Sequence, residues 1–360
     1  MQPAASTAIR TCGERLAGLA TAVAVTAILA GCAPQGSGPA AAYRIYASNE
    51  ISGDLSVIDG ASGKVVASVP LGKRPRGVVV SPDGRFIYVA LSGSPIGGPN
   101  VDESKLPPPD KQADGVGVVN AASLTVVRVL RGVSDPEQLA ISPDGKTLYL
   151  ASQDANQVVA TDAESGRILA TAYAGGEPEG IAVSPDGGRV YASSEEGATV
   201  TAFGAPGLTP LGRIGVGERA RGIAFAGDGK RAFVTGENDS SLTEIDVPGG
   251  AALRKVKLPG AGAKPMGVVV APGGGLLFVT TGRGGMLLAV DPATLGVVGQ
   301  AKVGARPWGV AISPDGKRLF TANGPSGDVS ELDAASLKLL RTIKVGDRPW
   351  GVAVGKAPGG

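Results

Sequence analysis

Seven short segments place two side chains, all but one of them charged or aromatic, two residues apart on either side of a Pro or Ala. In chain order the pairs are Arg74 and Arg76, Asp135 and Glu137, Glu177 and Glu179, Arg219 and Arg221, Lys264 and Met266, Arg306 and Trp308, and Arg348 and Trp350. Arginine forks suit carboxylate or phosphate groups, and tryptophan offers a stacking or cation–π surface. The pattern predicts a site for a small anionic ligand or for a protein partner.

The signs of these pairs leave two interpretations open. Two consecutive pairs are acidic and the other five contain a base, two of them beside a tryptophan. If all seven pairs meet in space, an acidic side of the mouth faces a basic side that carries two aromatic platforms. In the alternative, neighbouring Arg and Glu side chains pair with each other and the two tryptophans fill space.

The composition excludes several kinds of catalytic site. The 360 residues contain no histidine, which rules out Ser-His and Cys-His dyads, His-ligated zinc and His-ligated haem. The two cysteines, Cys12 and Cys32, both lie near the start of the chain. We therefore expect no catalytic residue, cofactor or metal. An esterase or lactonase built on Arg and Glu alone stays open, but its base would need a carboxylate with a raised pKa.

The spacing of the seven pairs reveals a repeat. The residue directly after each pair marks the repeat, and these residues stand at positions 77, 138, 180, 222, 267, 309 and 351. Successive positions are 61, 42, 42, 45, 42 and 42 residues apart. A period near 42 is typical of a β-propeller or a similar array. The longer first step is one repeat plus an insertion of about 19 residues.

Each repeat reads as four short strands. An apolar run ending in Ser-Pro-Asp-Gly, as in 77–84, precedes a second strand such as 86–92, and Pro and Gly suit the hairpin turn between them. A third strand such as 54–60 alternates, and a fourth such as 64–72 is amphipathic. We expect the first strand to be buried on both faces and the fourth to be an edge.

The order of strands predicts a closed ring over residues 43–356. The chain opens with a second, third and fourth strand from residue 43 and ends with a lone first strand at 351–355. The expected fold is an all-β, seven-bladed β-propeller of four-stranded antiparallel blades, closed by pairing the C-terminal strand with the N-terminal strands. Its channel mouth would gather the loops before the first strands, and with them the seven pairs.

The insertion, residues 93–115, follows the strand expected at 86–92. It lies on the same face of the ring as the mouth. It could cover the mouth or dock a partner, or it could be a tolerated surface excursion. Its four acids could offer oxygen ligands to Ca²⁺, but their spacing matches no calcium loop, so solvated carboxylates are the favoured interpretation. These acids are Asp102, Glu103, Asp110 and Asp114.

The first 31 residues have the pattern of an export signal, with two arginines ahead of an apolar stretch of small residues at 16–31. Leu29-Ala30-Gly31-Cys32 resembles a bacterial lipobox. That resemblance implies a lipid on Cys32, a flexible tether over 32–42, and a cell-envelope location, at the outer membrane facing the periplasm or at the cell surface. The alternative is an ordinary signal peptide in which Cys32 is incidental.

The repeat from residue 43 to 355 resembles the YVTN family of bacterial propellers. V-S-P-D-G stands at 80–84 and 183–187, and Y-V-A-L at 88–91 and L-S-V-I-D at 55–59 are similar to the family's Y-V-A-N and V-S-V-I-D elements. Several blades are similar to propellers associated with quinone-dependent (PQQ) catabolism. Because the fold alone does not decide function, we expect a non-catalytic binding or scaffold protein; the alternative is a periplasmic enzyme or an accessory to a quinone-dependent dehydrogenase. With a net charge of +2, no nucleic-acid surface is expected, and we expect a monomer.

Overall fold

The computed structural model of the chain describes residues 43–97, 101–260 and 262–357. The expected signal peptide (1–31), the lipid-bearing Cys32 and the tether (32–42) lie outside the described residues. Within the described ranges, no helix is long and apolar enough to cross a membrane. One short 3-10 helix, η1 (Glu103–Lys105), lies in the insertion.

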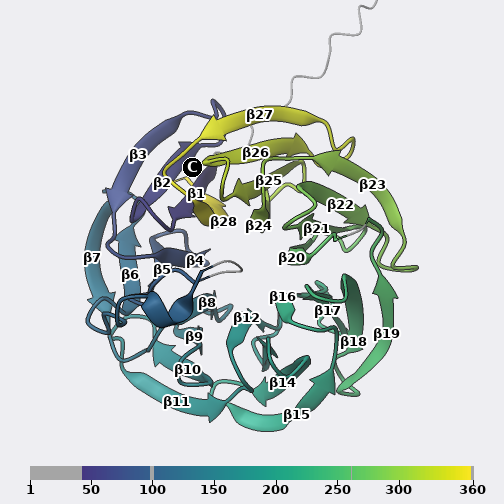
Figure 1. Cartoon of the computed structure of the whole chain (residues 1–360), viewed down its shortest axis with the longest axis horizontal. Helices are drawn as coiled ribbons and strands as arrows, with labels where there is room; N and C mark the ends of the chain where they lie inside the picture. Colours follow the sequence, from purple (N-terminus) through teal and green to yellow (C-terminus); the bar gives the residue numbers. More distant parts are fainter. Residues whose placement is uncertain (1–42, 98–100, 261, 358–360) are drawn as a thin grey trace, which may run out of the picture. The chain divides into compact units, whose positions relative to one another are not determined.

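The described residues form seven four-stranded antiparallel sheets arranged around a central axis (Figure 1). The innermost strands are β4 (Pro75–Val80), β8 (Pro136–Ile141), β12 (Pro178–Val183), β16 (Ala220–Phe225), β20 (Pro265–Val270), β24 (Pro307–Ile312) and β28 (Pro349–Lys356). The second strands are β1 (Tyr43–Asn49), β5 (Phe86–Leu91), β9 (Thr147–Ser152), β13 (Arg189–Ser194), β17 (Arg231–Gly236), β21 (Leu277–Thr281) and β25 (Arg318–Asn323).

The outer half of each sheet completes the blade. The third strands are β2 (Asp54–Asp59), β6 (Gly115–Asn120), β10 (Gln157–Asp162), β14 (Thr199–Gly204), β18 (Ser241–Asp246), β22 (Met286–Val290) and β26 (Asp328–Asp333). The outermost strands are β3 (Val65–Pro70), β7 (Thr125–Leu130), β11 (Ile168–Tyr173), β15 (Thr209–Gly215), β19 (Ala251–Lys257), β23 (Val297–Lys302) and β27 (Leu339–Lys344).

One sheet joins the two ends of the propeller. Its strand order is β28-β1-β2-β3, and β28 pairs with β1 from Tyr43 opposite Lys356 to Asn49 opposite Pro349. The last strand is therefore the innermost strand of the sheet that β1 begins. The predicted seven-bladed, four-stranded, end-to-end closed propeller is confirmed.

The most deeply buried strands are the second and third of each blade, not the first. All six residues of β9 are buried, whereas β24 has one buried residue and five half-buried ones. The prediction that the first strand is buried on both faces is wrong, because one side of that strand borders the central channel. The outermost strands are largely exposed, as β15 shows, in keeping with an edge position.

In six of the seven blades a glycine follows the pair, the exception being Gln138, and the neighbouring inner strand lies very close to that glycine. A Cβ on Gly222 would lie 2.5 Å from the carbonyl oxygen of Met266, and one on Gly267 would lie 2.6 Å from that of Trp308. A hydroxyl from the second strand bridges the same gap, as Thr280 Oγ1 donates to the Trp308 carbonyl at 2.8 Å. These contacts fix the tops of neighbouring inner strands side by side.

The Ser-Pro-Asp-Gly turns lie at the other end of the inner strands. Asp83 accepts hydrogen bonds from the Ser81 hydroxyl at 2.6 Å and the Arg85 N–H at 3.0 Å, and these bonds lower its pKa to about 2. Gly84 has a φ of 72°, the left-handed conformation that glycine adopts without steric cost. The turn carboxylates are thus committed to the backbone, away from the mouth.

Candidate functional site

The thirteen charged and aromatic residues predicted for the mouth line one cavity of about 960 Å³ at one end of the channel. They are Arg74, Arg76, Asp135, Glu137, Glu177, Glu179, Arg219, Arg221, Lys264, Arg306, Trp308, Arg348 and Trp350. The loops that enter the seven inner strands bring them together. We call this space the mouth cavity.

The backbone at the first member of each pair is unusual. All seven have a φ between 39° and 58°, and none is a glycine: Arg74, Asp135, Glu177, Arg219, Lys264, Arg306 and Arg348. Such a conformation costs a side-chain-bearing residue about 1–3 kcal/mol. The carbonyl of each accepts a hydrogen bond from the residue after the second strand, as in Glu195 N–H to Glu177 O at 3.1 Å. The local fold therefore holds these side chains at the mouth at an energetic cost.

The loops after the second strands supply further charged residues that the sequence prediction missed. Glu50, Glu195 and Glu237 follow directly after β1, β13 and β17, and each lines the mouth cavity. Glu196 and Arg283 lie one residue beyond the equivalent position and line it too. A charged residue directly after the second strand was the signal that could have identified this set.

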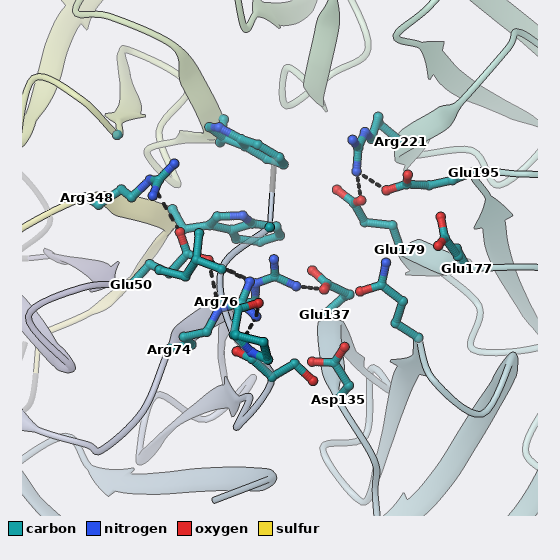
Figure 2. A pocket seen from close by; sticks show the side chains of 18 of the residues that line it. Glu50, Arg74, Arg76, Asp135, Glu137, Glu177, Glu179, Glu195, Arg221 and Arg348 are labelled. Atoms are coloured by element: carbon teal, nitrogen blue, oxygen red, sulfur yellow. Dashed lines mark hydrogen bonds and ion pairs between the residues drawn. The ribbon is translucent and has the colours of Figure 1, made fainter. Parts of the chain in front are cut away.

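Two buried groups of ion pairs form the base of the mouth cavity (Figure 2). In the first, the Glu50 cluster, the Glu50 carboxylate contacts Arg74 Nη2 at 2.9 Å, Arg76 Nε at 3.4 Å and Arg348 Nε at 3.6 Å, and Arg76 also pairs with Glu137. Burial disfavours the charge on Glu50, but Arg76 and Arg74 outweigh it and keep the pKa of Glu50 below its ordinary value. Three guanidinium groups and two carboxylates leave this cluster with an excess of one positive charge.

The second group, the Arg221 cluster, has the opposite composition. Arg221 is 6% exposed and pairs with Glu179, Glu195 and Glu237, the last at 2.7 Å. Arg219 lies further out and contacts Glu195 at 2.8 Å and Glu237 at 3.2 Å. When all three carboxyl groups are ionised, the two guanidinium groups leave an excess of one negative charge. Burial and repulsion from Glu237 and Glu196 outweigh the attraction of Arg219 and raise the pKa of Glu195 to about 7.

Ion pairing between neighbouring pairs, the second interpretation, occurs in part of the mouth. Arg76 pairs with Glu137, and Arg221 pairs with Glu179, so the inner members neutralise one another between neighbouring blades. The outer members do not all pair. Among the residues that the structure describes, no carboxylate lies within ion-pair distance of the three side chains that we call the cationic arc, Lys264, Arg283 and Arg306.

The two tryptophans lie together in the channel, between the mouth cavity and the space below it. Their ring centroids are 5.4 Å apart, Arg76 lies 5.6 Å from the Trp350 ring, and Arg306 and Arg221 lie 5.1 and 5.4 Å from the Trp308 ring. The rings also border a narrower space of about 140 Å³ below, lined by valine and isoleucine side chains together with Gln138, Glu179 and Arg221. Because both rings already have stacked partners, the arrangement favours a packing role over a platform for ligand.

The insertion forms one wall of the mouth cavity. It runs from Ser92 to Asp114, since Gly115 begins β6, one residue short of the predicted end. Arg74 Nη1 donates to the Ser94 carbonyl at 2.6 Å, and Lys73 pairs with Asp110 at 2.7 Å. The residues that face the cavity are Ser94, Pro95, Ile96, Gly97, Leu106, Pro107, Pro108 and Pro109.

The insertion carboxylates considered for calcium have separate partners. Asp102 pairs with Lys105 at 2.9 Å, whereas Asp110 pairs with Lys73. Asp114 accepts the backbone N–H groups of Gly93 and Asp135 at 2.7 and 3.0 Å. The contacts of Asp110 and Asp114 tie the insertion to the ring, whereas the Asp102–Lys105 pair lies within the insertion. No group of three or more potential metal ligands is found among the described residues.

Comparisons with known proteins agree on the fold. Over 159 residues the chain is 26% identical to Antigen Lp49 of Leptospira interrogans serogroup Icterohaemorrhagiae serovar copenhageni (strain Fiocruz L1-130). That alignment covers 36% of this chain and 35% of the antigen, so the chain matches about a third of that curated relative's length.

Two solved structures share the architecture at low identity. A putative 6-phosphogluconolactonase from Bacteroides fragilis NCTC 9343 superposes with a TM-score of 0.71 at 17% identity, over 89% of this chain and 99% of that one. Hydrazine synthase of Kuenenia stuttgartiensis superposes with a TM-score of 0.66 at 18% identity, over 78% and 89%. The model of the YNCE-like beta-propeller family matches residues 101–358, well over half of the sequence. The chain therefore belongs to the YNCE-like β-propeller family.

Proposed function

We propose that the chain is a binding propeller whose mouth cavity takes a small ligand with a carboxylate or phosphate group. The observation that carries this proposal is the cationic arc, three bases in one cavity with no carboxylate within ion-pair distance among the described residues. Most of the other bases at the mouth already pair with Glu50, Glu137 or the acids of the Arg221 cluster. The arc is the part of the lining that retains capacity for an anion.

Arg306 is the central member of this arc. Its guanidinium lies over the Trp308 ring, and burial, together with repulsion from Arg348, lowers the pKa of Arg306. A bound anion would offset that repulsion and accept charge-assisted hydrogen bonds from the guanidinium. Lys264 is held close by, with its Nζ donating to Asn238 at 2.8 Å.

Replacing Arg306 by Gln is expected to weaken binding of small anions about tenfold, the effect of losing roughly 1.4 kcal/mol of interaction. Isothermal titration calorimetry with inorganic phosphate, pyrophosphate and citrate at low salt measures this. The matched control is Arg213→Gln, which removes the same charge from the outer strand β15, where Arg213 stacks on Tyr173. Equal affinities for the two variants would count against the arc as the anion site.

We further propose that the protein acts in the cell envelope, exported and held by a lipid on Cys32, at the outer membrane facing the periplasm or at the cell surface. The lipobox-like Leu29-Ala30-Gly31-Cys32 supports this. In this setting the mouth could instead receive a segment of a partner protein. The likeness of several blades to propellers associated with quinone-dependent catabolism supports a role as an accessory to a dehydrogenase.

A second candidate function is hydrolysis of a small ester or lactone. The observation that favours it is Glu195, a buried carboxyl whose pKa is raised to about 7 beside the Arg221 guanidinium. A carboxylate of that pKa meets the requirement for a general base near neutral pH. Arg221 would stabilise developing negative charge on a substrate oxygen.

If Glu195 is such a base, lactone turnover should rise as the pH increases through about 7 and then level off, because only the ionised carboxylate accepts a proton. Glu195→Gln should abolish this turnover. A pH-stat assay over pH 5.5–8, corrected for spontaneous hydrolysis, measures the profile. Turnover that is absent from the wild type, or unchanged in Glu195→Gln, would contradict the enzymatic candidate and leave the binding proposal in place.

A further inference from the structure

The mouth cavity also has an acidic wall, opposite in sign to the cationic arc. Glu177 and Glu196 both line the cavity from the blade of β12, and the Glu196 carboxylate lies against Gly176 in the loop that carries Glu177. Glu177 is half-buried, and burial, with repulsion from Glu195 and Glu196, raises its pKa. In the described part of the chain, no basic side chain lies within ion-pair distance of Glu177 or Glu196. The acidic wall is therefore as unpaired as the arc.

The two walls face each other across the channel. The acidic wall belongs to the blade of β12, and the arc belongs to the blades of β20 and β24. In Figure 1, β12 and β24 lie on opposite sides of the central space. Three of the seven blade-to-blade steps separate β12 from β24, whose entry loop carries Arg306, and two separate it from the blade of β20, which carries Lys264 and Arg283. Unpaired charges of opposite sign thus lie at opposite sides of one cavity.

This arrangement discriminates between classes of ligand. A dianion placed on the cationic arc would bring its second negative charge toward Glu177 and Glu196, and like charges within one cavity repel each other. In the same way, a ligand with two positive charges would bring one of them toward the bases of the cationic arc. A molecule with an anionic group at one end and an ammonium group at the other satisfies both walls at once.

The remaining wall suits the body of such a molecule. The insertion contributes Ile96, Leu106 and the three prolines that follow Leu106 to the cavity lining. These side chains offer apolar contact to an aliphatic spacer between two charged ends.

We propose that the mouth cavity selects a zwitterionic small molecule, with its carboxylate or phosphate on Lys264, Arg283 and Arg306 and its ammonium group on Glu177 and Glu196. This inference rests on the proposed binding function and specifies the ligand class for it.

The test is calorimetry with matched linear ligands of four, six and eight carbons, each length offered as an ω-amino acid, a dicarboxylate and a diamine. For the best length, the amino acid should bind the full-length wild type at least about tenfold tighter than the dicarboxylate and the diamine. In Glu177→Gln/Glu196→Gln, the amino acid should lose about tenfold while the dicarboxylate binds as well or better. Glu164→Gln, in the exposed turn between β10 and β11, serves as the control and should change neither.

The outcomes separate the two proposals. A dicarboxylate that equals or exceeds the amino acid at every length overturns the zwitterion inference and leaves the anion site standing. Unchanged amino-acid affinity in the double variant overturns it as well. If neither the amino acids nor the dicarboxylates bind, the zwitterion inference fails, and the phosphate, pyrophosphate and citrate titrations decide whether the anion site stands.

Discussion

Deletion of residues 349–360 is expected to abolish cooperative unfolding of the propeller, or to lower its Tm by more than about 10 °C. The deletion removes β28, which pairs with β1 along its whole length and packs between β24 and β4 in the inner ring. It also removes the buried side chains of Trp350 and Val352. Each such side chain contributes about 1.5–3 kcal/mol by burial. The sheet β28-β1-β2-β3 is left with three strands and an open edge.

The size of this effect follows from the small net stability of folded domains, about 5–15 kcal/mol. The deletion removes several buried side chains and the hydrogen bond that the Gly351 N–H donates to the Ser48 hydroxyl at 3.0 Å. Together these losses amount to much of that net stability. Circular dichroism melting measures the result. A chain lacking only residues 357–360, which follow β28, is the control and should keep its Tm. A 349–360 deletion that melts as the full chain does would show that β28 does not close the ring.

The blades could be predicted from the sequence because their signals are local and repeated. The strands expected to begin at residues 43 and 86 are β1 and β5, and the strand expected at 54–60 is β2. Each copy of the turn and apolar run supports the assignment of the others, so an irregular copy such as Ala226-Gly227-Asp228-Gly229 does little harm. Gly229 there still has a φ of 67°, like the glycines of the regular turns.

The burial of the inner strands could not be read in the same way. An apolar run is compatible both with a strand covered on two faces and with a strand that borders a narrow channel. The difference depends on how many blades surround the axis and how closely their inner strands approach, which is a property of the closed ring. The glycines at this contact, such as Gly222, acquire their meaning only from the neighbouring blade.

The pairing within the site was also beyond the sequence. Glu50 meets Arg74 and Arg76, which are near it in the chain, and Arg348, which is almost 300 residues away. Nothing local indicates that a residue of the first loop completes a cluster with one of the last. The residues entering the inner strands could be predicted to converge, but their partners come from loops after the second strands.

Arg221→Met is expected to destabilise the propeller by about 3–5 kcal/mol, the cost of removing one partner from a buried group of ion pairs. It leaves Glu179, Glu195 and Glu237 close together with little access to water. Arg219→Met is the matched control, because Arg219 contacts the same Glu195 and Glu237 but its side chain is 45% exposed. An exposed pair contributes about 0–1 kcal/mol, so the control should lose no more than that.

The pH dependence of the Arg221→Met variant identifies the cause of its instability. Without the guanidinium, the folded state raises the pKa of the three carboxyls above the value in the unfolded chain, near 4.5. Their destabilising effect is then absent below that pH and grows as the pH rises through the raised values. Urea unfolding at pH 5 and pH 7.5 should therefore give a smaller deficit at pH 5. A deficit that is the same at both pH values, or shared equally by Arg219→Met, would mean that lost packing rather than stranded charge destabilises the variant.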